Sequence, residues 1–547
     1  MPLVSLVTFL PLAGGLALIF FPRERIRAAR YFALAVSLLT FAVSLALYFG
    51  YDGGSGAAEF VERGRWIGYG LDYHVGIDGV SLFLVLLTTF LTPLALLASW
   101  KAIDGRVREF SFFMLFLETG IIGVFVSMNL FLFYVFWEAM LVPMYFLIGM
   151  WGGPRRIYAT LKFVLFTMAG SLLMLVAIFV LYARVHQATG VASLAFQDLY
   201  GLALPPGLQT WLFLAFALAF AIKVPLFPLH TWLPDAHVEA PTAGSVMLAA
   251  LLLKMGAYGF VRLGFPLFPE AAVRFAPALS ILAVVGIIYG GFMALVQKDM
   301  KSLVAYSSVS HMGLVCLALF AMNTEATEGA IFQMISHGLS TGALFLCVGV
   351  LYERSHTRLI KDYGGVSRQM PFFSAVFLVA MLSSMGLPGL NGFVGEILCF
   401  FGVFAGNKVL GALAVSTVIL SAAYLLWLFR RVMHGPVVNE KIHGFKDMDR
   451  RERLYLLPII VLMFWLGLFP GSVLRKMDAS VERYLQTIKV KAPTQAENLR
   501  ITTSIPGPRA GLSSGAAGSA VTRPAGSSAR ANGIPVSPES RFKEGRE

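Results

Sequence analysis

Several side chains that can carry a proton lie inside long apolar stretches of this sequence. An ionisable residue at mid-depth in a bilayer costs about 2.5–3.5 kcal/mol on insertion scales, so such residues are rare unless they have a partner or a function. Carboxylate, ammonium and imidazole groups have different pKa values, and a nearby opposite charge shifts the pKa of each. The residues are Glu118, Glu138, Lys223, Lys254, His311, His337 and Glu396.

Proton transfer is the chemistry that this set supports. One buried carboxylate or lysine alone would be explained by a static ion pair between two helices, and one histidine alone by packing. Here an acid, two bases, two imidazoles and a second acid follow one another along the chain. Bridged by water, such groups form a path whose proton occupancy depends on charge–charge coupling. We therefore predict an ion translocator, in which Glu118 is a neighbour that tunes Glu138.

The composition identifies the surroundings of these residues. Of the 547 residues, 57% are hydrophobic and 13% are charged. Soluble domains carry about 25% charged residues, so this chain has too little polar surface to cover a globule of its size. The composition excludes a soluble enzyme, a disordered chain and a collagen-like chain, and it predicts a polytopic membrane protein.

Fourteen apolar runs are long enough to cross the bilayer, whose hydrocarbon is roughly 30 Å thick and needs about 20 helical residues. Lipid offers no partners to backbone groups and the runs do not alternate, so we expect helices and not a β-barrel. The first run is interpreted as a retained span. The runs cover residues 2–21, 31–50, 78–100, 110–127, 129–151, 163–183, 208–232, 240–261, 275–297, 302–321, 329–352, 371–406, 409–429 and 454–474.

The distribution of basic residues supports this assignment. The odd-numbered connections between the runs hold 23 Lys and Arg, and the even-numbered connections hold 6. Lys and Arg stay on the cytoplasmic side of membrane proteins, so both termini are expected on the periplasmic side. The same rule accounts for the net charge of +13 without a nucleic-acid partner.

Two of the fourteen runs are interrupted by proline. The seventh contains Pro225 and Pro228, and the twelfth contains Pro388 among glycines. Proline removes a helix donor, and the freed carbonyls must face protein or water. Broken helices at matching positions of two halves are typical of inverted-repeat transporters. We therefore expect an all-α membrane protein of about 14 transmembrane helices, with two inverted five-helix repeats in which helices 7 and 12 are broken.

The expected organisation has five parts. Helices 1–3 occupy residues 1–109, the first repeat (helices 4–8) residues 110–261, and the second repeat (helices 9–13) residues 275–429. A connecting loop, helix 14 and an amphipathic end follow over residues 430–490. Residues 491–547, rich in Ser, Gly, Pro, Ala and Arg, are expected to be a disordered tail, because they cannot bury enough apolar surface to offset their ordering entropy.

Cofactor chemistry is not indicated on this chain. Cys316, Cys347 and Cys399 stand at no metal or redox spacing. No glycine-rich nucleotide motif occurs in a strand–turn–helix context. We therefore assign no nucleotide, haem, iron–sulfur cluster or metal to it.

Three segments carry a family likeness. Residues 136–151 read FWEAMLVPMYFLIGMW, residues 230–246 read HTWLPDAHVEAPTAGSV, and residues 253–256 read LKMG. On these motifs the chain, over about residues 1–480, resembles subunit M of the proton-pumping NADH:quinone oxidoreductase, respiratory complex I. That subunit is the bacterial counterpart of mitochondrial chain 4 and a member of the antiporter-like subunit family. The tail has no counterpart in the family pattern.

The resemblance implies roles for particular residues. Glu138 and Lys223 would form a switchable pair on helices 5 and 7. Lys254 would be the central lysine of helix 8 and would relay the proton to Glu396, the glutamate of helix 12 near the outer exit. The family's channel histidines match His230, His311 and His337.

The resemblance also implies a place in a larger enzyme. NADH, FMN, the iron–sulfur clusters and quinone would be used by other subunits of the assembled complex, with no redox chemistry on this chain. Its partners would be the other membrane-arm subunits, especially the two other antiporter-like subunits, and the lipid bilayer. It would lie in the bacterial inner membrane and contribute proton pumping coupled to electron transfer from NADH to quinone.

Two alternatives remain open. A subunit of a multi-subunit sodium/proton antiporter would share the architecture and much of the row of charges. The sequence of residues 230–246 and 253–256 favours complex I. A chain of this fold could also be a scaffold with an inactive channel.

Overall fold

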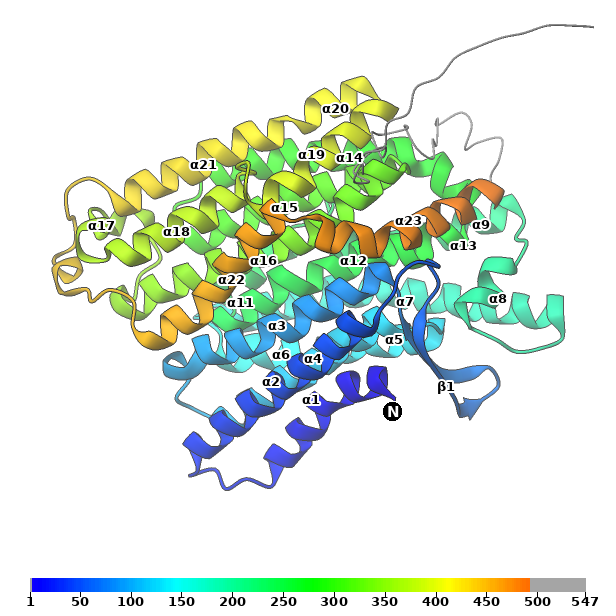
Figure 1. The fold of residues 1–547 in the computed structure, drawn as a ribbon, viewed down its shortest axis with the longest axis horizontal. Helices are drawn as coiled ribbons and strands as arrows, with labels where there is room; N and C mark the ends of the chain where they lie inside the picture. Colours follow the sequence, from blue (N-terminus) through cyan, green and yellow to red (C-terminus); the bar gives the residue numbers. More distant parts are fainter. Residues whose placement is uncertain (1, 492–547) are drawn as a thin grey trace, which may run out of the picture. The chain divides into compact units, whose positions relative to one another are not determined.

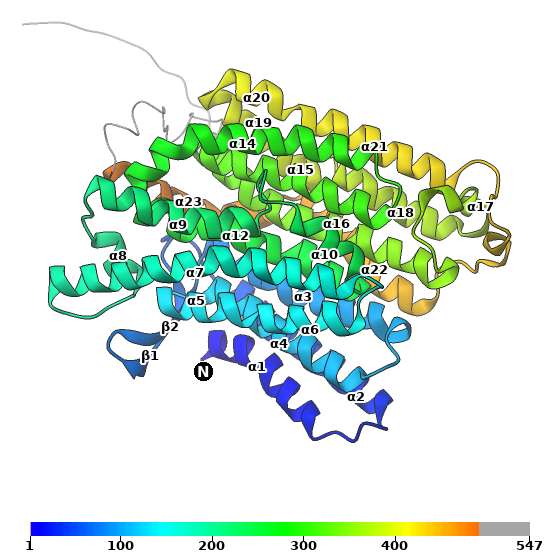
Figure 2. The same ribbon diagram turned by 180° about the vertical axis from the view of Figure 1, so that it is seen from behind.

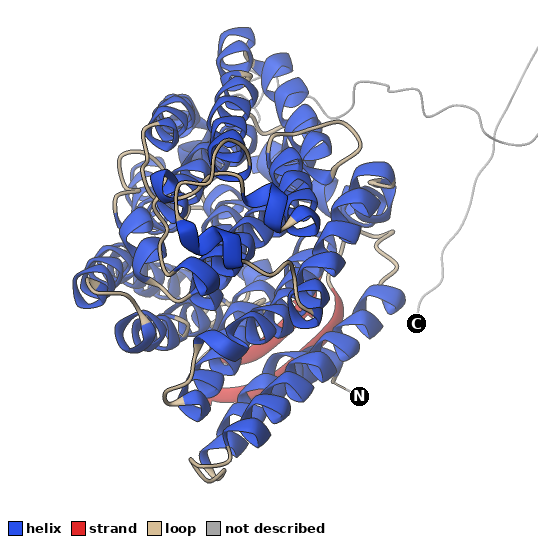
Figure 3. Ribbon diagram, turned by 90° about the vertical axis from the view of Figure 1, so that its left-hand side faces the viewer, coloured by secondary structure: helices blue, strands red, loops and turns tan. Residues whose placement is uncertain are grey.

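The computed structural model describes residues 2–491, so the predicted tail beyond Lys491 lies outside the described residues. The described chain folds into helices that lie side by side, with one two-stranded hairpin (Figure 3). The predicted class of helical membrane protein is confirmed, and the hairpin is an addition that the hydropathy pattern did not indicate.

The N-terminal part contains three helices and the hairpin. The antiparallel strands lie between the second and third helices and pair Arg63 with His74. The Glu62 carboxylate on the first strand accepts hydrogen bonds from the Val4 and Ser5 backbone N–H groups, which satisfies donors left open at the start of the first helix. The elements are α1 (Leu3–Ile19), α2 (Ile26–Gly50), β1 (Glu59–Gly68), β2 (Leu71–Ile77) and α3 (Gly79–Ala102).

The next part contains an interruption and an irregular helix. Helix α9 ends at Lys223 and helical structure resumes at Trp232. Residues 242–267 are helical throughout, but two wide π-helical turns, η1 (Leu248–Leu252) and η2 (Phe260–Gly264), divide them. The helices are α4 (Val107–Val126), α5 (Leu130–Ala139), α6 (Leu141–Trp151), α7 (Arg156–Thr189), α8 (Phe196–Gly201), α9 (Pro206–Lys223), α10 (Trp232–Glu239), α11 (Thr242–Met247), α12 (Leu253–Gly259) and α13 (Phe265–Leu267).

The C-terminal part contains a second interruption, between Ser384 at the end of α18 and Asn391 at the start of α19. Its elements are α14 (Pro269–Leu295), α15 (Met300–Phe320), α16 (Thr324–Ser355), η3 (Ile360–Asp362), α17 (Val366–Gln369), α18 (Pro371–Ser384), α19 (Asn391–Gly406), α20 (Lys408–Ala414), α21 (Ser416–Met433), η4 (Glu440–Gly444), α22 (Arg450–Leu468) and α23 (Gly471–Lys491).

The described residues contain eleven helical segments that are long and apolar enough to cross a membrane, or twelve when α22 and α23, bent by 66° at their junction, count as one. Three further apolar helices are shorter, namely α1, α18 and α19. The chain is therefore an integral membrane protein. The predicted total of about fourteen spans requires that α1 and a joined α18–α19 pair cross as well.

Acidic and amide side chains define where several helices begin. The Asp78 carboxylate accepts hydrogen bonds from the N–H groups of Val80 and Ser81 at the start of α3. At the start of α22, Asp449 accepts from the Glu452 N–H while the Glu452 carboxylate accepts from the Asp449 N–H, each at 2.8 Å. A cap of this kind contributes about 1 kcal/mol, and it explains why the helices start at these residues.

Two of the helices that carry predicted site residues, α15 with His311 and α16 with His337, lie at the centre of the fold. In the apolar stretches of α15 and α16, 94% and 100% of the residues are buried, against 33% in α2. Figure 1 shows α22 and α23 on one side of these helices, and Figure 2 shows α7, α9 and α14 on the other. Helices α16 and α19 approach closely because Gly402 has no side chain, and a Cβ there would lie 2.3 Å from the Ala326 nitrogen.

A two-pronged ion pair joins the end of α16 to the start of α22. The Arg354 guanidinium donates to both oxygens of Glu452, at 2.7 and 2.8 Å, and the Glu452 side chain is 2% exposed. Two parallel charge-assisted hydrogen bonds are both stronger and more directional than a single contact. This pair therefore holds the two helix ends in one relative position.

We expect Arg354→Ala to destabilise the protein by about 3 kcal/mol, because Glu452 would stay buried with only the longer contact of 4.0 Å to Arg451. The control is Arg63→Ala, which removes an exposed partner of Asp72 on the hairpin and should cost about 1 kcal/mol or less. The measurement is the loss of thermal stability of the purified protein. Equal losses in the two variants would contradict this view of the α16–α22 junction.

Candidate functional site

Lys254 lies at one end of a buried row of polar side chains. Just before it, the helix widens into the π-helical turn η1, where the Leu253 N–H donates to the Leu248 carbonyl five residues back. The Lys254 Nζ donates to the Ala249 carbonyl at 2.6 Å. Wide turns of this kind free backbone groups and often occur at functional sites. The irregular turn therefore supplies one of the partners that a fully buried lysine needs.

The second partner of Lys254 is His337 on α16. Lys254 Nζ and His337 Nδ1 are 2.7 Å apart, whereas His337 Nε2 is buried without a hydrogen-bond partner among the described residues. An ammonium group only donates, so His337 is neutral with Nδ1 as acceptor when Lys254 is charged. A proton can therefore pass between the two groups across a single short contact.

His311 on α15 and Glu396 on α19 continue the row. The rings of His337 and His311 have centroids 5.8 Å apart. The His311 Nδ1 lies 3.3 Å from Glu396 Oε1, an ion-pair distance without hydrogen-bond alignment, and its Nε2 lies 3.3 Å from the Tyr424 hydroxyl. The structure thus brings together four of the predicted residues on four helices, namely Lys254, His337, His311 and Glu396.

The Glu396 carboxylate is held from two directions. Gln333 of α16 donates to its Oε1 at 3.4 Å, and its Oε2 lies beside Gly386 in the connection between α18 and α19. Gly386 has φ +73°, and a Cβ there would lie 2.4 Å from Glu396 Oε2. Only glycine combines this backbone conformation with this lack of bulk. The interruption between α18 and α19 therefore shapes the end of the row.

Lys223 lies elsewhere, in an aromatic pocket at the last residue of α9. Its Nζ is 5.1 Å from the centre of the Trp137 ring, 5.8 Å from that of Phe163 and 4.0 Å from the Met140 sulfur. Aromatic faces attract a cation but do not replace a carboxylate. In this conformation no ion pair of 4.0 Å or less joins Lys223 to Glu138, whose Oε1 is buried without a partner in the described part of the chain.

Two other predicted residues stand apart from the row. Both oxygens of Glu118, which is fully buried on α4, lack hydrogen-bond partners within the described residues. His230 lies in the interruption after α9, with its ring 5.6 Å from Phe227 and 5.1 Å from Tyr289. Among the described residues no hydrogen bond or ring contact connects His230 to Lys254 or His337, so its assignment to the channel stays a prediction.

The structure adds two buried basic residues that sequence reasoning missed. His237 on α10 is fully buried and stacks on Phe345 with ring centroids 4.7 Å apart. Lys301, in the first turn of α15, is 4% exposed and donates to the Ala240 carbonyl at 2.6 Å and to Ser245 Oγ at 3.1 Å. His237 is the last residue of the HTWLPDAH motif, which is the sequence signal that points to it. Lys301 directly precedes the tenth apolar run, so hydropathy assigns it to a loop.

Within residues 2–491 no group of three or more His, Cys, Asp or Glu side chains is placed to hold a metal ion. The three cysteines are buried and form no disulfide. The contacts from Lys254 to Glu396 form a row of proton donors and acceptors on adjoining helices.

Comparison with known families gives two matches. Residues 127–421 match the family described as NADH:quinone oxidoreductase/Mrp antiporter, and residues 64–126 match the amino terminus of NADH-ubiquinone oxidoreductase chain 4. A similar curated protein is NADH-quinone oxidoreductase subunit M of Rhodobacter capsulatus, which is 46% identical over 90% of this chain and 98% of its own length.

Two solved structures have a similar fold. A chain of respiratory complex I from Thermus thermophilus, solved with bound NADH, is 34% identical, with a TM-score of 0.81 over 89% of this chain and 99% of that one. A chain of the Mrp complex from Dietzia has a TM-score of 0.76 over 92% of this chain and all of that one. The second is 20% identical and shows the fold alone.

We expect Gly386→Ala to displace the Glu396 carboxylate, because the new methyl group would meet Oε2. The control is Gly389→Ala, in the same connection, where φ is +92° and no atom lies within 4 Å of the added Cβ. Both variants carry similar backbone strain, but only the first has a clash. The measurement is the His311–Glu396 distance in a structure of each variant, and an unchanged distance in Gly386→Ala would contradict the role of this glycine.

Proposed function

Because this chain belongs to the subunit M family of NADH:quinone oxidoreductases, we propose that its buried row of ionisable side chains is the path by which it moves protons across the membrane. The chain is a membrane-arm, antiporter-like subunit of respiratory complex I, which couples electron transfer from NADH to quinone to proton translocation. The observation that carries the proposal is the sequence of contacts from Lys254 through His337 and His311 to Glu396.

The proton moves along this row by exchange of partners. Lys254 passes it to His337 Nδ1 across 2.7 Å. His337 then releases a proton from Nε2 toward His311, whose ring is 5.8 Å away between centroids, so this step needs a bridging water or a ring rotation. His311 delivers it to Glu396, the last acceptor of the row, at 3.3 Å.

Glu138 and Lys223 control the loading of Lys254. An ammonium group in an apolar pocket is stabilised when a carboxylate stands beside it. Movement of Glu138 toward Lys223 or away from it therefore changes whether Lys223 keeps its proton. We assign the arrangement without an ion pair between Glu138 and Lys223 to one of the two states of this switch, and Glu118 tunes Glu138 as a further buried carboxyl group.

The finer architecture is part of the proposal. We assign fourteen spans, with α1 and the α18–α19 pair among them, and two inverted five-helix repeats over residues 110–261 and 275–429. The interruption after Lys223 and the interruption before Asn391 are the breaks of helices 7 and 12, and they support this assignment because one lies in each repeat. Residues 1–109 and 430–490 pack outside the repeats.

The chain assembles with other complex I subunits, and we assign the two other antiporter-like subunits as its neighbours. NADH, FMN, the iron–sulfur clusters and quinone belong to other subunits, and none is assigned to this chain. The excess of Lys and Arg in the odd-numbered connections places both termini on the periplasmic side of a bacterial inner membrane.

A subunit of a multi-subunit sodium/proton antiporter is the weaker alternative, since the Mrp chain shares the fold at 20% identity while the subunit M relative shares 46% of its residues. A scaffold with an inactive channel is the alternative from another class. The variants below distinguish a working path from such a scaffold.

We expect Glu138→Gln and Lys223→Ala to leave assembly of the complex largely intact while lowering proton transfer through this subunit on the order of 10²-fold, because each removes one half of the switch. The measurement is proton pumping per NADH oxidised in membrane vesicles, with assembly checked on native gels. Glu24→Gln and Lys361→Ala, at exposed positions, are the matched controls. Normal proton flux in both test variants would contradict the assigned roles.

We expect His337→Ala to interrupt the row at its second member and to lower proton pumping as strongly as Lys254→Ala. The control is His186→Gln, an exposed histidine near the end of α7 that lies outside the row. Because the Lys254→Ala and His337→Ala variants break the same contact, the double variant should lose no more than either one alone. Additive losses would show that the two residues act on separate paths.

A further inference from the structure

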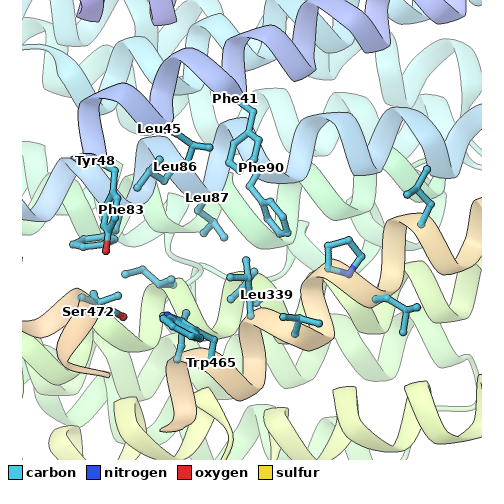
Figure 4. A pocket seen from close by; sticks show the side chains of 18 of the residues that line it. Phe41, Leu45, Tyr48, Phe83, Leu86, Leu87, Phe90, Leu339, Trp465 and Ser472 are labelled. Carbon is cyan, nitrogen blue, oxygen red and sulfur yellow. The ribbon is translucent and has the colours of Figure 1, made fainter. Parts of the chain in front are cut away.

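A large apolar groove of about 1060 Å³ lies open between two groups of helices, away from the proton path. Figure 4 shows side chains of α2 and α3 on one side and of α22 on the other, with Leu339 of α16 between them. The side chains along α22 are accessible, with Val461 63% and Trp465 51% exposed. In a membrane protein an apolar groove of this kind is filled either by lipid or by a neighbouring chain.

The two walls of the groove are tied together at both ends. At one end Lys101, in the last turn of α3, donates to the Asp449 carboxylate at 2.7 Å at the start of α22. At the other end the Gly79 N–H donates to Ser480 Oγ on α23 at 3.0 Å, and Lys476 donates to the Tyr51 carbonyl. The walls are therefore held in position while the middle stays open.

One end of the groove is basic. Arg450 and Arg453, in the first turn of α22, line it and are exposed. Neither guanidinium takes part in an ion pair with a described residue. Arg453 donates from Nε to the Met448 carbonyl at 3.1 Å and lies 4.9 Å from the centre of the Phe372 ring, so its terminal N–H groups have no hydrogen-bond partner among the described residues. The far end, at Ser472 and Val473, has no charged residue in its lining, and the nearby Lys476 ammonium is already engaged by the Tyr51 carbonyl and the Tyr48 ring. The groove therefore has a cationic head and a long apolar body.

We propose that this groove binds an anionic glycerophospholipid, with its phosphate between Arg450 and Arg453 and its acyl chains lying along α22 toward Trp465. Guanidinium groups match phosphate oxygens in two-pronged hydrogen bonds. Basic pockets between transmembrane helices bind anionic headgroups, and the connection before Arg453 belongs to the Lys- and Arg-rich side. A lipid fits the asymmetry of the groove better than a partner's helix, which would have to bring two carboxylates to the membrane boundary.

The bound lipid would occupy the space between α3 and α22 and pack against both helices. Its acyl chains would pack on Ile335 and Leu339, which line the groove and flank His337 along α16. The lipid would therefore support the helix that carries the site histidine without touching the row itself. Binding of the lipid does not depend on the proposed proton path.

The occupant can be identified by photo-crosslinking in the assembled complex. A benzophenone amino acid replaces Val461, the complex is purified in mild detergent and illuminated, and the α22 peptide is analysed by mass spectrometry. We expect adducts with the mass of an anionic phospholipid. An adduct to a peptide of another subunit, or adducts to detergent alone, would overturn the proposal.

Headgroup recognition is tested with delipidated complex incubated with vesicles of phosphatidylglycerol or of phosphatidylcholine. We expect Arg450→Gln/Arg453→Gln to lower the affinity for phosphatidylglycerol about 30-fold, at about 1 kcal/mol for each basic residue, with little effect on phosphatidylcholine. The matched control is Arg430→Gln/Arg431→Gln, two exposed arginines at the end of α21 that do not line the groove. Leu457→Trp fills the groove and should weaken the binding of both lipids. The proposal is overturned if Arg450→Gln/Arg453→Gln leaves phosphatidylglycerol binding unchanged, or if Leu457→Trp leaves the binding of both lipids unchanged.

Discussion

An ionisable side chain in the middle of a bilayer must find its partners inside the protein, and the arrangement of this fold depends on that constraint. Lys254 meets it with a backbone carbonyl and an imidazole. Lys301 meets it with a carbonyl and a hydroxyl. Lys223 contacts aromatic faces and a sulfur, with no ion pair of 4.0 Å or less among the described residues. The three lysines thus differ in how strongly their surroundings hold the charge.

Irregular backbone supplies partners that regular helices cannot. A straight α-helix uses its own carbonyls, whereas the Ala249 carbonyl in the π-helical turn before Lys254 accepts from the ammonium group. The interruption before α19 brings Gly386 against Glu396, where a side chain would leave no room. Both irregularities occur at members of the same row, which links local backbone geometry to the chemistry of the site.

The ion pairs at helix ends and the row in the interior serve different purposes. Arg354 and Glu452 form two parallel hydrogen bonds, and Lys162 forms an ion pair with Asp235 at 2.7 Å. These contacts fix the positions of the helices that they join. In the row, His337 Nε2 and Glu396 Oε2 have no hydrogen-bond partner among residues 2–491. A saturated network is rigid, whereas groups with unused capacity can exchange partners. The fold therefore combines helix ends that are fixed by ion pairs with an interior row whose hydrogen bonds can change.

The sequence by itself determined the membrane class, the approximate positions of most helices and the identity of the ionisable residues, because hydropathy and the cost of a buried charge are properties of single segments. Only the tertiary structure decided that Lys254 contacts His337, that Glu138 Oε1 makes no hydrogen bond to a described residue, that Lys301 is buried, and that α3 and α22 enclose a groove. These outcomes depend on how each helix is rotated and packed against the others. Packing arises from contacts between segments far apart in the chain, which the spacing of residues within one segment does not encode.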